Sequence, residues 1–282
     1  MRNLTGLPDP GDYTLGRGRL YFAYIVAATG LPDANGFRFM GNCPEFNVSI
    51  TAEKLEHKSS QTGLSVTDLE ILKSLKVDLK FSLDEQNDEN MALWSAGEEG
   101  SITNPAIAGF SATVMTNAVK LGRWYEIRNS SGVRAYDIDT SKLTVRRDPS
   151  GTPVTLVLGD DYEVNTKMGL IFFLADPATA SLVDGDKIDV ALSADAGASP
   201  VYEVKALTTT EGLRGCLLFI QENAQGSVQR EFRFHEVSIS ADGDLGLISE
   251  EIGVMQFSGS VTKNVLADAD SPYYTVRSHA AA

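Results

Sequence analysis

The chain has 282 residues, of which 43% are hydrophobic, and a formal net charge of -14 at pH 7. This length can bury one large core or two modest ones, and we expect two domains. Tight nucleic-acid binding requires clustered Lys and Arg, but 24 basic residues stand against 38 acidic ones with no basic run among them. Tight DNA binding is therefore not expected.

No segment predicts a membrane span or an export signal. The longest apolar run, GLIFFLA at 169–175, is far shorter than the ~20 residues that a membrane helix needs. Cys43 and Cys216 are the only cysteines, which are too few for a disulfide framework. We expect a soluble protein with two reduced thiols, suited to a reducing cytoplasm.

The first part of the chain predicts strands and one short helix. Phe46, Val48 and Ile50 alternate with polar residues, as half-buried strands do. The strands are expected at 19–26, 36–41, 45–51 and 76–83. Between the last two lies a polar arm, far longer than the ~2 to 5 residues of a usual hairpin loop. A helix is predicted within 84–97, with Asp84 or Asn87 as its cap and Gly97 at its end.

The region 118–205 reads as a second, inserted domain. Its short strands are separated by turn signals, as in a β-sandwich, and they are expected within 123–129, 143–148, 154–159, 161–165, 169–175 and 187–194. Plausible linkers at 112–118 and 194–204 flank it. Residues 1–117 and 206–282 form the first domain, with further strands at 214–223, 230–240 and 253–264.

The predicted fold class is therefore mainly β. It consists of a β-sandwich or partial barrel with one short flanking α-helix, plus the inserted β-sandwich domain.

Catalytic patterns are missing from the sequence. The three histidines, His57, His235 and His279, belong to no known catalytic motif, and each is expected to be structural or exposed. ADGDLG at 241–246 and VDGDK at 183–187 match only part of a calcium loop, so hairpin turns are favoured. We predict no catalytic, metal or cofactor site, and that the protein is not an enzyme.

The order of these parts resembles the major tail tube protein of long-tailed (siphovirus-type) bacteriophages. The resemblance rests on the strand GNCPEFNVSI at 41–50, the arm with KLEHKSSQTG, the strand KVDLKFSLDE, the helix with NMALWSAG, and FHEVSISADGDLGLISEEIGVMQFSGSV near the end. It covers roughly residues 15–110 and 210–265. The position of the inserted domain departs from family members that append an immunoglobulin-like domain at the C-terminus.

The resemblance implies a structural virion protein. Members form hexameric rings that stack into a hollow tail tube, the channel for genome delivery. The implied partners are other copies of the chain, the tape measure, tail terminator and baseplate or tail tip proteins, with DNA only as passing cargo and no membrane. The implied locations are the virion tail and, during assembly, the host cytoplasm. The insert would be an immunoglobulin-like domain on the outer surface.

Strand alternation assigns residues to two faces. The core face is expected to hold Phe46, Val48, Ile50, Val77, Leu79, Phe81, Leu83, Val237, Ile239, Phe257 and Val261. The other face, short of charge, is the candidate channel lining: Glu45, Asn47, Ser49, Thr51, Asp78, Lys80, Ser82, Glu236, Ser238, Ser240, Gln256, Ser258, Ser260 and Thr262. The candidate contacts to a neighbouring ring are Lys54, Leu55, Glu56, His57, Lys58, Gln61, Leu64 and Val66.

Two other classes of function remain open. The inserted sandwich and the acidic surface are compatible with a surface-binding or adhesion module, although the missing export signal and disulfides weigh against it. A β-rich hydrolase whose site forms only in three dimensions is the other alternative.

Overall fold

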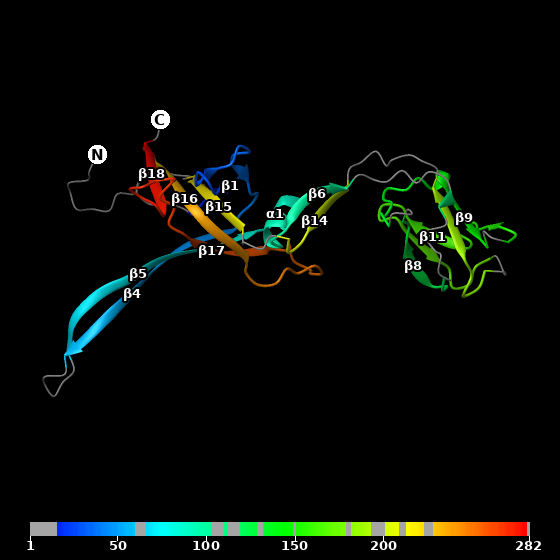
Figure 1. Ribbon diagram of the computed structural model, residues 1–282, viewed down its shortest axis with the longest axis horizontal. Coiled ribbons are helices and arrows are strands. Elements are labelled where there is room, and N and C mark those ends of the chain that lie inside the picture. Colours follow the sequence, from blue (N-terminus) through cyan, green and yellow to red (C-terminus); the bar gives the residue numbers. More distant parts are fainter. Residues whose placement is uncertain are drawn as a thin grey trace. The chain divides into compact units, whose positions relative to one another are not determined.

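We describe a computed structural model of the chain (Figure 1). The structure describes residues 16–59, 66–102, 110–111, 119–128, 132–148, 151–178, 182–192, 201–208, 213–222 and 228–280. Among them, no helix is long and apolar enough to cross a membrane.

The chain divides into two compact units. The first comprises Met1–Glu99 and Val204–Ala282, and the second comprises Gly100–Glu203. The insertion thus begins earlier than the expected boundary at 117/118 and ends close to the expected one. The strands β6 (Glu98–Ile102) and β14 (Val201–Lys205) pair with each other where the chain passes between the units. Part of the linker expected at 194–204 is therefore strand.

The first unit is built on one antiparallel sheet of nine strands, with the order β2-β1-β15-β16-β17-β5-β4, in which β3 also pairs with β1 and β18 with β16. Its strands are β1 (Gly18–Val26), β2 (Leu31–Pro32), β3 (Arg38–Phe39), β4 (Glu45–Ser59), β5 (Val66–Leu83), β15 (Leu213–Gln221), β16 (Val228–Ala241), β17 (Met255–Val261) and β18 (Tyr274–Ala280). Sequence analysis did not predict β18.

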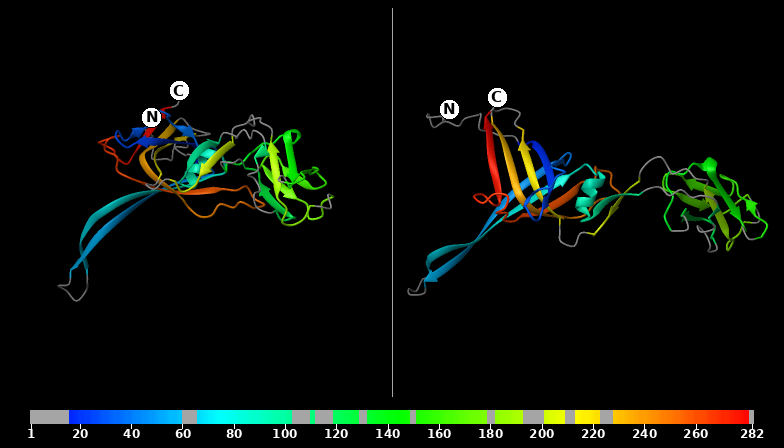
Figure 2. Two further views of the ribbon diagram at one scale, coloured as in Figure 1. Left: turned by 45° about the vertical axis from the view of Figure 1, so that its right-hand side comes forward. Right: turned by 45° about the horizontal axis from the view of Figure 1, so that its top comes forward.

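The sheet folds over along β16, which makes two layers. Residues 228–234 of β16 pair with β18, and residues 237–241 pair with β17. Figure 2 (right) shows β18, β16, β15 and β1 side by side, with the β4–β5 ribbon crossing them. The apolar sides of the two layers face each other, and the core forms between them.

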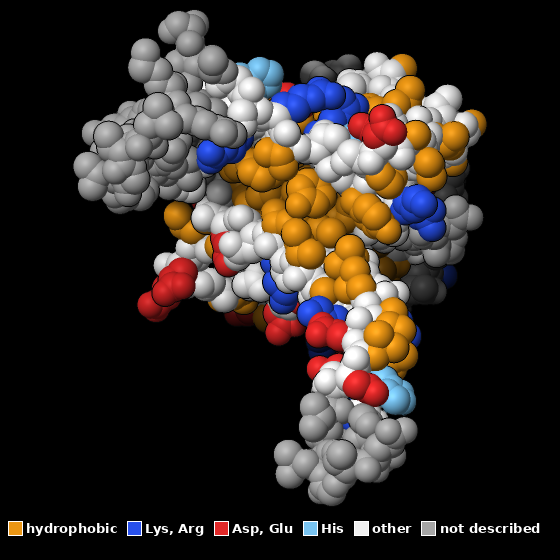
Figure 3. All heavy atoms as spheres, turned by 90° about the vertical axis from the view of Figure 1, so that its left-hand side faces the viewer, with side chains coloured by type: hydrophobic (Ala, Val, Ile, Leu, Met, Phe, Trp, Pro, Cys, Tyr) orange, Lys and Arg blue, Asp and Glu red, His pale blue; other side chains and the backbone are white. Residues whose placement is uncertain are grey.

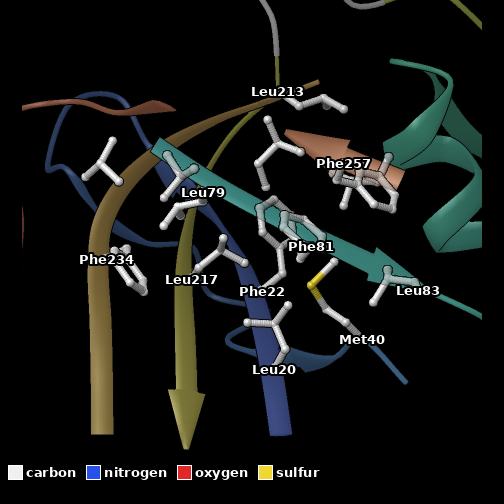
Figure 4. Close-up of a cluster of buried hydrophobic side chains, with 14 of the residues drawn as sticks. Leu20, Phe22, Met40, Leu79, Phe81, Leu83, Leu213, Leu217, Phe234 and Phe257 are labelled. Carbon is white, nitrogen blue, oxygen red and sulfur yellow. The ribbon is translucent and has the colours of Figure 1, made fainter. Parts of the chain in front are cut away.

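The core of the first unit joins side chains from both layers (Figure 4). Leu20 and Phe22 come from β1 and Leu79 from β5, and all three are fully buried. The rings of Phe81 and Phe257 stack with their centroids 4.8 Å apart. These packed aromatic and aliphatic groups hold β5 and β17 against β1 and β15.

One α-helix, α1 (Asp88–Trp94), is present in the described part of the chain. Of its two candidate caps, Asn87 is correct, because its side chain accepts a hydrogen bond from Asn90 N at 2.8 Å. Gly97 follows the helix, but the left-handed residue is Ala96, with φ 48°. Gly97 is required for a different reason, since a Cβ there would meet the Lys205 carbonyl oxygen at 2.3 Å.

The second unit contains a four-stranded sheet, β10-β9-β13-β7, and a three-stranded sheet, β11-β12-β8. Its elements are β7 (Phe110–Ser111), β8 (Arg123–Glu126), a 3-10 helix (Thr140–Lys142), β9 (Leu143–Arg147), β10 (Val154–Thr155), β11 (Tyr162–Asn165), β12 (Leu170–Phe173) and β13 (Ile188–Leu192). Its core is separate from that of the first unit and includes Val145, Ile171 and Phe173. The mainly β, sandwich-like fold predicted from sequence is confirmed.

Candidate functional site

Four neighbouring strands, β4, β5, β17 and β16, bring the candidate channel residues onto one sheet face. Cross-strand pairing aligns them in rows: Glu45–Ser82–Gln256, Asn47–Lys80–Ser258–Ser240 and Ser49–Asp78–Ser260–Ser238. Thr51 pairs with Lys76, and Thr262 N donates to the Glu236 carbonyl oxygen at 2.9 Å. We call this set the polar face.

The polar face is open over most of its area. Asn47, Ser49 and Ser240 are exposed, and a hollow lined mostly by polar side chains of all four strands, two lysines among them, lies over its centre. The Oγ atoms of Ser240 and Ser258 lie 3.0 Å apart, within hydrogen-bonding distance. Ser82 is the exception, because it is buried, with 9% of its surface exposed. The expectation that Ser82 lines an open surface is therefore wrong for this chain by itself.

The lysines of the polar face are paired with carboxylates. Lys80 Nζ lies 3.2 Å from Asp242, and Lys76 Nζ lies 2.9 Å from Asp78. Sequence analysis missed Lys76 and Asp242, although Lys76 continues the alternation of β5 and Asp242 directly follows β16. With both included, the face carries four carboxylates and two ammonium groups.

Two of the predicted core positions are exposed. Val48 is 41% and Ile50 is 59% exposed, whereas the other predicted core residues of β5, β16 and β17 are buried. The facing layer reaches only as far as Phe46, whose ring lies 5.2 Å from that of Phe219. Beyond that point β4 leaves the body of the unit, whereas β5 stays covered as far as Val77; farther out, nothing in the described part of the chain covers the apolar side of either strand.

The polar arm is a two-stranded ribbon, because β4 and β5 stay paired from Glu53 to Ser59 and from Val66 to Ser74. Lys54, Leu55, Glu56, His57 and Lys58 lie in β4. Val66 begins β5, and Gln61 and Leu64 lie outside the described residues.

Two cross-strand ion pairs and a hydrogen bond between His57 and Asp68 join most of the charged side chains of the arm. Lys73 lies 3.0 Å from Glu53, His57 lies 2.6 Å from Asp68, and Lys54 contacts Glu70. Because these pairs are exposed to solvent, each contributes little to stability. The charged groups in these pairs contact each other across the two strands of the arm.

The arm also exposes a stripe of large apolar side chains, and Figure 3 shows apolar atoms from the body of the unit along the arm. Its members are 49 to 58% exposed: Leu55, Leu69, Ile71, Leu72 and Leu75. Sequence analysis included Leu55 but missed the four on β5, which the apolar residues of DLEILKSL indicate. Exposed groups of large apolar side chains like these mark surfaces that bind a partner.

A register shift changes which face of the arm is apolar. Ala52 pairs with Leu75, but β5 contains an extra residue opposite the step from Glu53 to Lys54. Leu55, three residues beyond Ala52, then pairs with Ile71 on the other face of the ribbon. One covering layer could not bury the apolar residues on both sides of this register shift. The ribbon therefore exposes apolar side chains on both of its faces.

A second hollow of the first unit, lined by residues from β1, α1, β15 and β16, combines apolar walls with paired charges. Arg38 Nη1 contacts Glu89 at 3.5 Å and Asn90 at 2.7 Å, and Arg214 contacts Glu236 at 3.6 Å. Its lining contains no histidine, cysteine or serine. In the ranges that the structure describes, no group of three or more His, Cys, Asp or Glu could hold a metal ion.

The histidines lie apart from one another. His57 is in the arm, His279 is in β18 at 3.7 Å from Glu231, and His235 is buried at the fold of β16. Both cysteines are free thiols. Burial raises the pKa of Cys43 to about 11 and also raises the pKa of Cys216.

The structure is that of a mainly β protein with an inserted sandwich unit and a projecting ribbon. Residues 13–277 match the family model described as "Protein of unknown function UCP028589", and the chain belongs to that family. A search of curated proteins found no match.

Proposed function

We propose that this protein is a structural subunit that assembles into a hollow tube, as the major tail tube protein of long-tailed bacteriophages does. In this proposal, hexameric rings stack along an axis, and the polar face lines the channel through which the genome passes. The observation that carries the proposal is the combination of an open polar face on four strands with an apolar ribbon that the described part of the chain leaves uncovered.

The sheet geometry supports this assembly. In the described chain, β4 is the last strand of the sheet, so its outer edge can pair with another chain. If six copies each contribute four strands, as the resemblance implies, the closed sheet has on the order of two dozen strands. That is more than the ~16 to 18 that already enclose an aqueous channel.

The chemistry of the polar face suits passing DNA. Its side chains are short hydroxyls and amides, and its two lysines lie beside Asp78 and Asp242. Phosphates dwell on unpaired clusters of Lys and Arg, and this face presents none among its described residues. Its slight excess of carboxylates would repel DNA weakly, so DNA could slide.

Electron microscopy of the purified full chain, at increasing concentration, tests the proposal. We expect rings or tubes of uniform width, preceded by monomers or weak oligomers at low concentration. A chain that stays monomeric or strictly dimeric at every concentration and salt condition would contradict it.

A surface-binding module remains the second candidate, and one observation favours it for the inserted unit. Trp124 of β8 is 50% exposed and lies 5.0 Å from the ring of Phe172 on the neighbouring strand. An exposed tryptophan packed beside a half-buried phenylalanine on a sheet face can bind a partner. The same microscopy separates the two candidates, because a binding module would form no tubes.

A further inference from the structure

The first unit has a strongly acidic end, formed by residues 84–89 and 242–254, which we call the loop end. The two segments are neighbours, because Met255 pairs with Leu83 and a Cβ on Gly253 would meet Gln86 Nε2 at 2.4 Å. The loop end carries eight carboxylates: Asp84, Glu85, Asp88, Glu89, Asp242, Asp244, Glu250 and Glu251. Two cations contact them, Arg38 at Glu89 and Lys80 at Asp242.

The loop end also presents apolar side chains to solvent. Leu247 is 83%, Ile248 is 99% and Ile252 is 78% exposed. The loop is anchored at its base, where Leu245 packs against the core. Three large aliphatic groups standing out of an anchored loop expose apolar area that a contact with another protein would remove from water.

The opposite end of the same sheet is basic. The beginnings of β1 and β16 and the ends of β15 and β18 meet there, since Gly18 pairs with Gln221 and Val228 with Ala280. We call it the arginine end. Among the described residues of this end, four arginines, Arg17, Arg19, Arg230 and Arg277, stand against two glutamates, Glu222 and Glu231, which leaves a net charge of +2 with His279 neutral. Val276, 47% exposed, lies among these groups.

The strand β16 runs from one end to the other. It begins at Val228 in the arginine end, and Ala241 leads directly into the loop end. In Figure 1, the C-terminal end of β18 lies at the top and the loop that follows β16 lies at the bottom. In a chain with a net charge of -14, a positive end opposite a strongly negative one separates charge along the sheet.

We propose that the loop end binds the arginine end of a second copy of this chain, head to tail. Glu250 and Glu251 would face the arginines of the second copy. Leu247, Ile248 and Ile252 would pack on apolar surface of the arginine end, such as Val276. Such a contact uses two different surfaces, so it does not end at a dimer and can repeat along an axis. This inference rests on the proposed function and assigns the surfaces that join successive rings.

Charge reversal tests the contact. Glu250→Lys with Glu251→Lys gives a chain with a less acidic loop end, and Arg17→Glu with Arg230→Glu gives one with an acidic arginine end. Sedimentation velocity and electron microscopy, on the full chain in low salt, measure association. We expect each variant alone to associate at least about tenfold more weakly than the unchanged chain, because lysines at 250 and 251 would lie beside arginines, and glutamates at 17 and 230 would lie beside Glu250 and Glu251.

Mixing the two variants provides the decisive measurement. In an equimolar mixture, the lysine-bearing loop of one variant faces the glutamate-bearing end of the other, so association should recover. An apolar variant, Ile248→Ser, should weaken association at all salt concentrations, whereas the charge effects should fade in high salt.

A control matched to the loop variant is Glu163→Lys with Asp176→Lys, which makes the same change of net charge at exposed positions of the second unit. It should associate as the unchanged chain does. If the loop variants assemble normally, or the mixture does not recover, the contact assigned here is wrong while the proposed function stands. If the unchanged chain never forms rings or tubes, the proposed function itself fails.

Discussion

His235 lies where β16 changes partners from β18 to β17, and its side chain is 6% exposed. Its backbone N–H donates to the Tyr273 carbonyl oxygen at 3.1 Å. Burial and the neighbouring Arg233 lower the pKa of His235; Arg277 acts in the same direction, and Asp268 opposes it. Neutral His235 is therefore part of the folded state.

This lowered pKa predicts acid sensitivity. Above the unfolded pKa of about 6.5, His235 is neutral in both states, so the stability is fully present. Below it, the unfolded chain takes up the proton first, and stability falls until the folded pKa is reached. His235→Gln should reduce the loss of stability between pH 7.5 and pH 5.5 by at most about 1.4 kcal/mol, because this window extends only about one unit below the unfolded pKa. Urea unfolding of both proteins at the two pH values measures this, and an identical loss would contradict it.

Cys43 predicts slow thiol chemistry. Burial raises its pKa to about 11, with Asp84 and Glu45 adding to the effect, and its Sγ–H donates to the Glu45 carbonyl oxygen at 3.2 Å. Because the thiolate is the nucleophile, alkylation at pH 8 should be on the order of a hundredfold slower than for a free cysteine. Iodoacetamide labelling of Cys216→Ala, folded and in urea, separates Cys43 from the buried Cys216. Equal rates in the two conditions would refute the prediction.

At the scale of elements, the ribbon formed by β4 and β5 is the part of the first unit that contributes least to its own core. Its apolar residues beyond Ala52 are exposed, and its ion pairs are local. Pairing shows that a clean deletion must remove both strands together, because Glu53 pairs with Ser74 across the base of the ribbon.

Replacing residues 54–73 by Asn-Gly should therefore leave a folded monomer that no longer forms tubes. Asn-Gly closes a two-residue hairpin between the paired residues Glu53 and Ser74. We expect the melting temperature to change by no more than about 4 °C, the shift of roughly 1 kcal/mol in a domain of this size. Calorimetry and electron microscopy measure the two effects. Long tubes from the deleted chain would show that the ribbon is only a surface hairpin, and Leu55→Ser with Ile71→Ser tests its apolar contacts without the deletion.

At the scale of the whole molecule, the inserted unit has its own core and joins the first unit through two paired strands. Gly97 and Lys205 are in close contact where the chain leaves and re-enters the first unit. Replacing residues 100–203 by a short Gly/Ser linker should preserve folding and tube formation, because the two ends are already adjacent. Circular dichroism and electron microscopy check this outcome. Loss of the whole fold would show that the insertion is required by the first unit.

The polar face predicts an effect on genome delivery. Arginine in place of Ser49, Ser240 and Ser258 would add three positive charges per chain to the polar face. Ser49 and Ser240 are exposed, and Ser258 is half-buried. We expect normal folding and tubes, but infectivity of assembled virions reduced by roughly tenfold or more, because phosphates would dwell on the new charges. Threonine at the same three positions is the matched control. Normal infectivity from virions that contain the triple-arginine tube would defeat the assignment of this face to the channel.

Local signals in the sequence determined several features. Strict alternation in NVSI and KVDLKFSL determined which side chains of β4 and β5 share a face, because successive side chains of a strand point to opposite sides. Asp84 or Asn87, with the acidic residues that follow, marked the start of α1 to within three residues, and the structure selects Asn87. Turn residues between short apolar runs marked the inserted unit as a body rich in strands.

Only the tertiary structure decided which of these residues are covered. Val48 and Leu79 are direct partners with the same alternation, yet the first is exposed and the second is fully buried, because the facing layer ends near Phe46. The fold of the sheet at His235, the pairing of β18, and the contact of Lys80 with Asp242 all join residues far apart in the chain. The alternation along a strand shows only on which side of that strand a side chain lies. Whether the side chain is buried depends on which distant segment of the chain packs against that side.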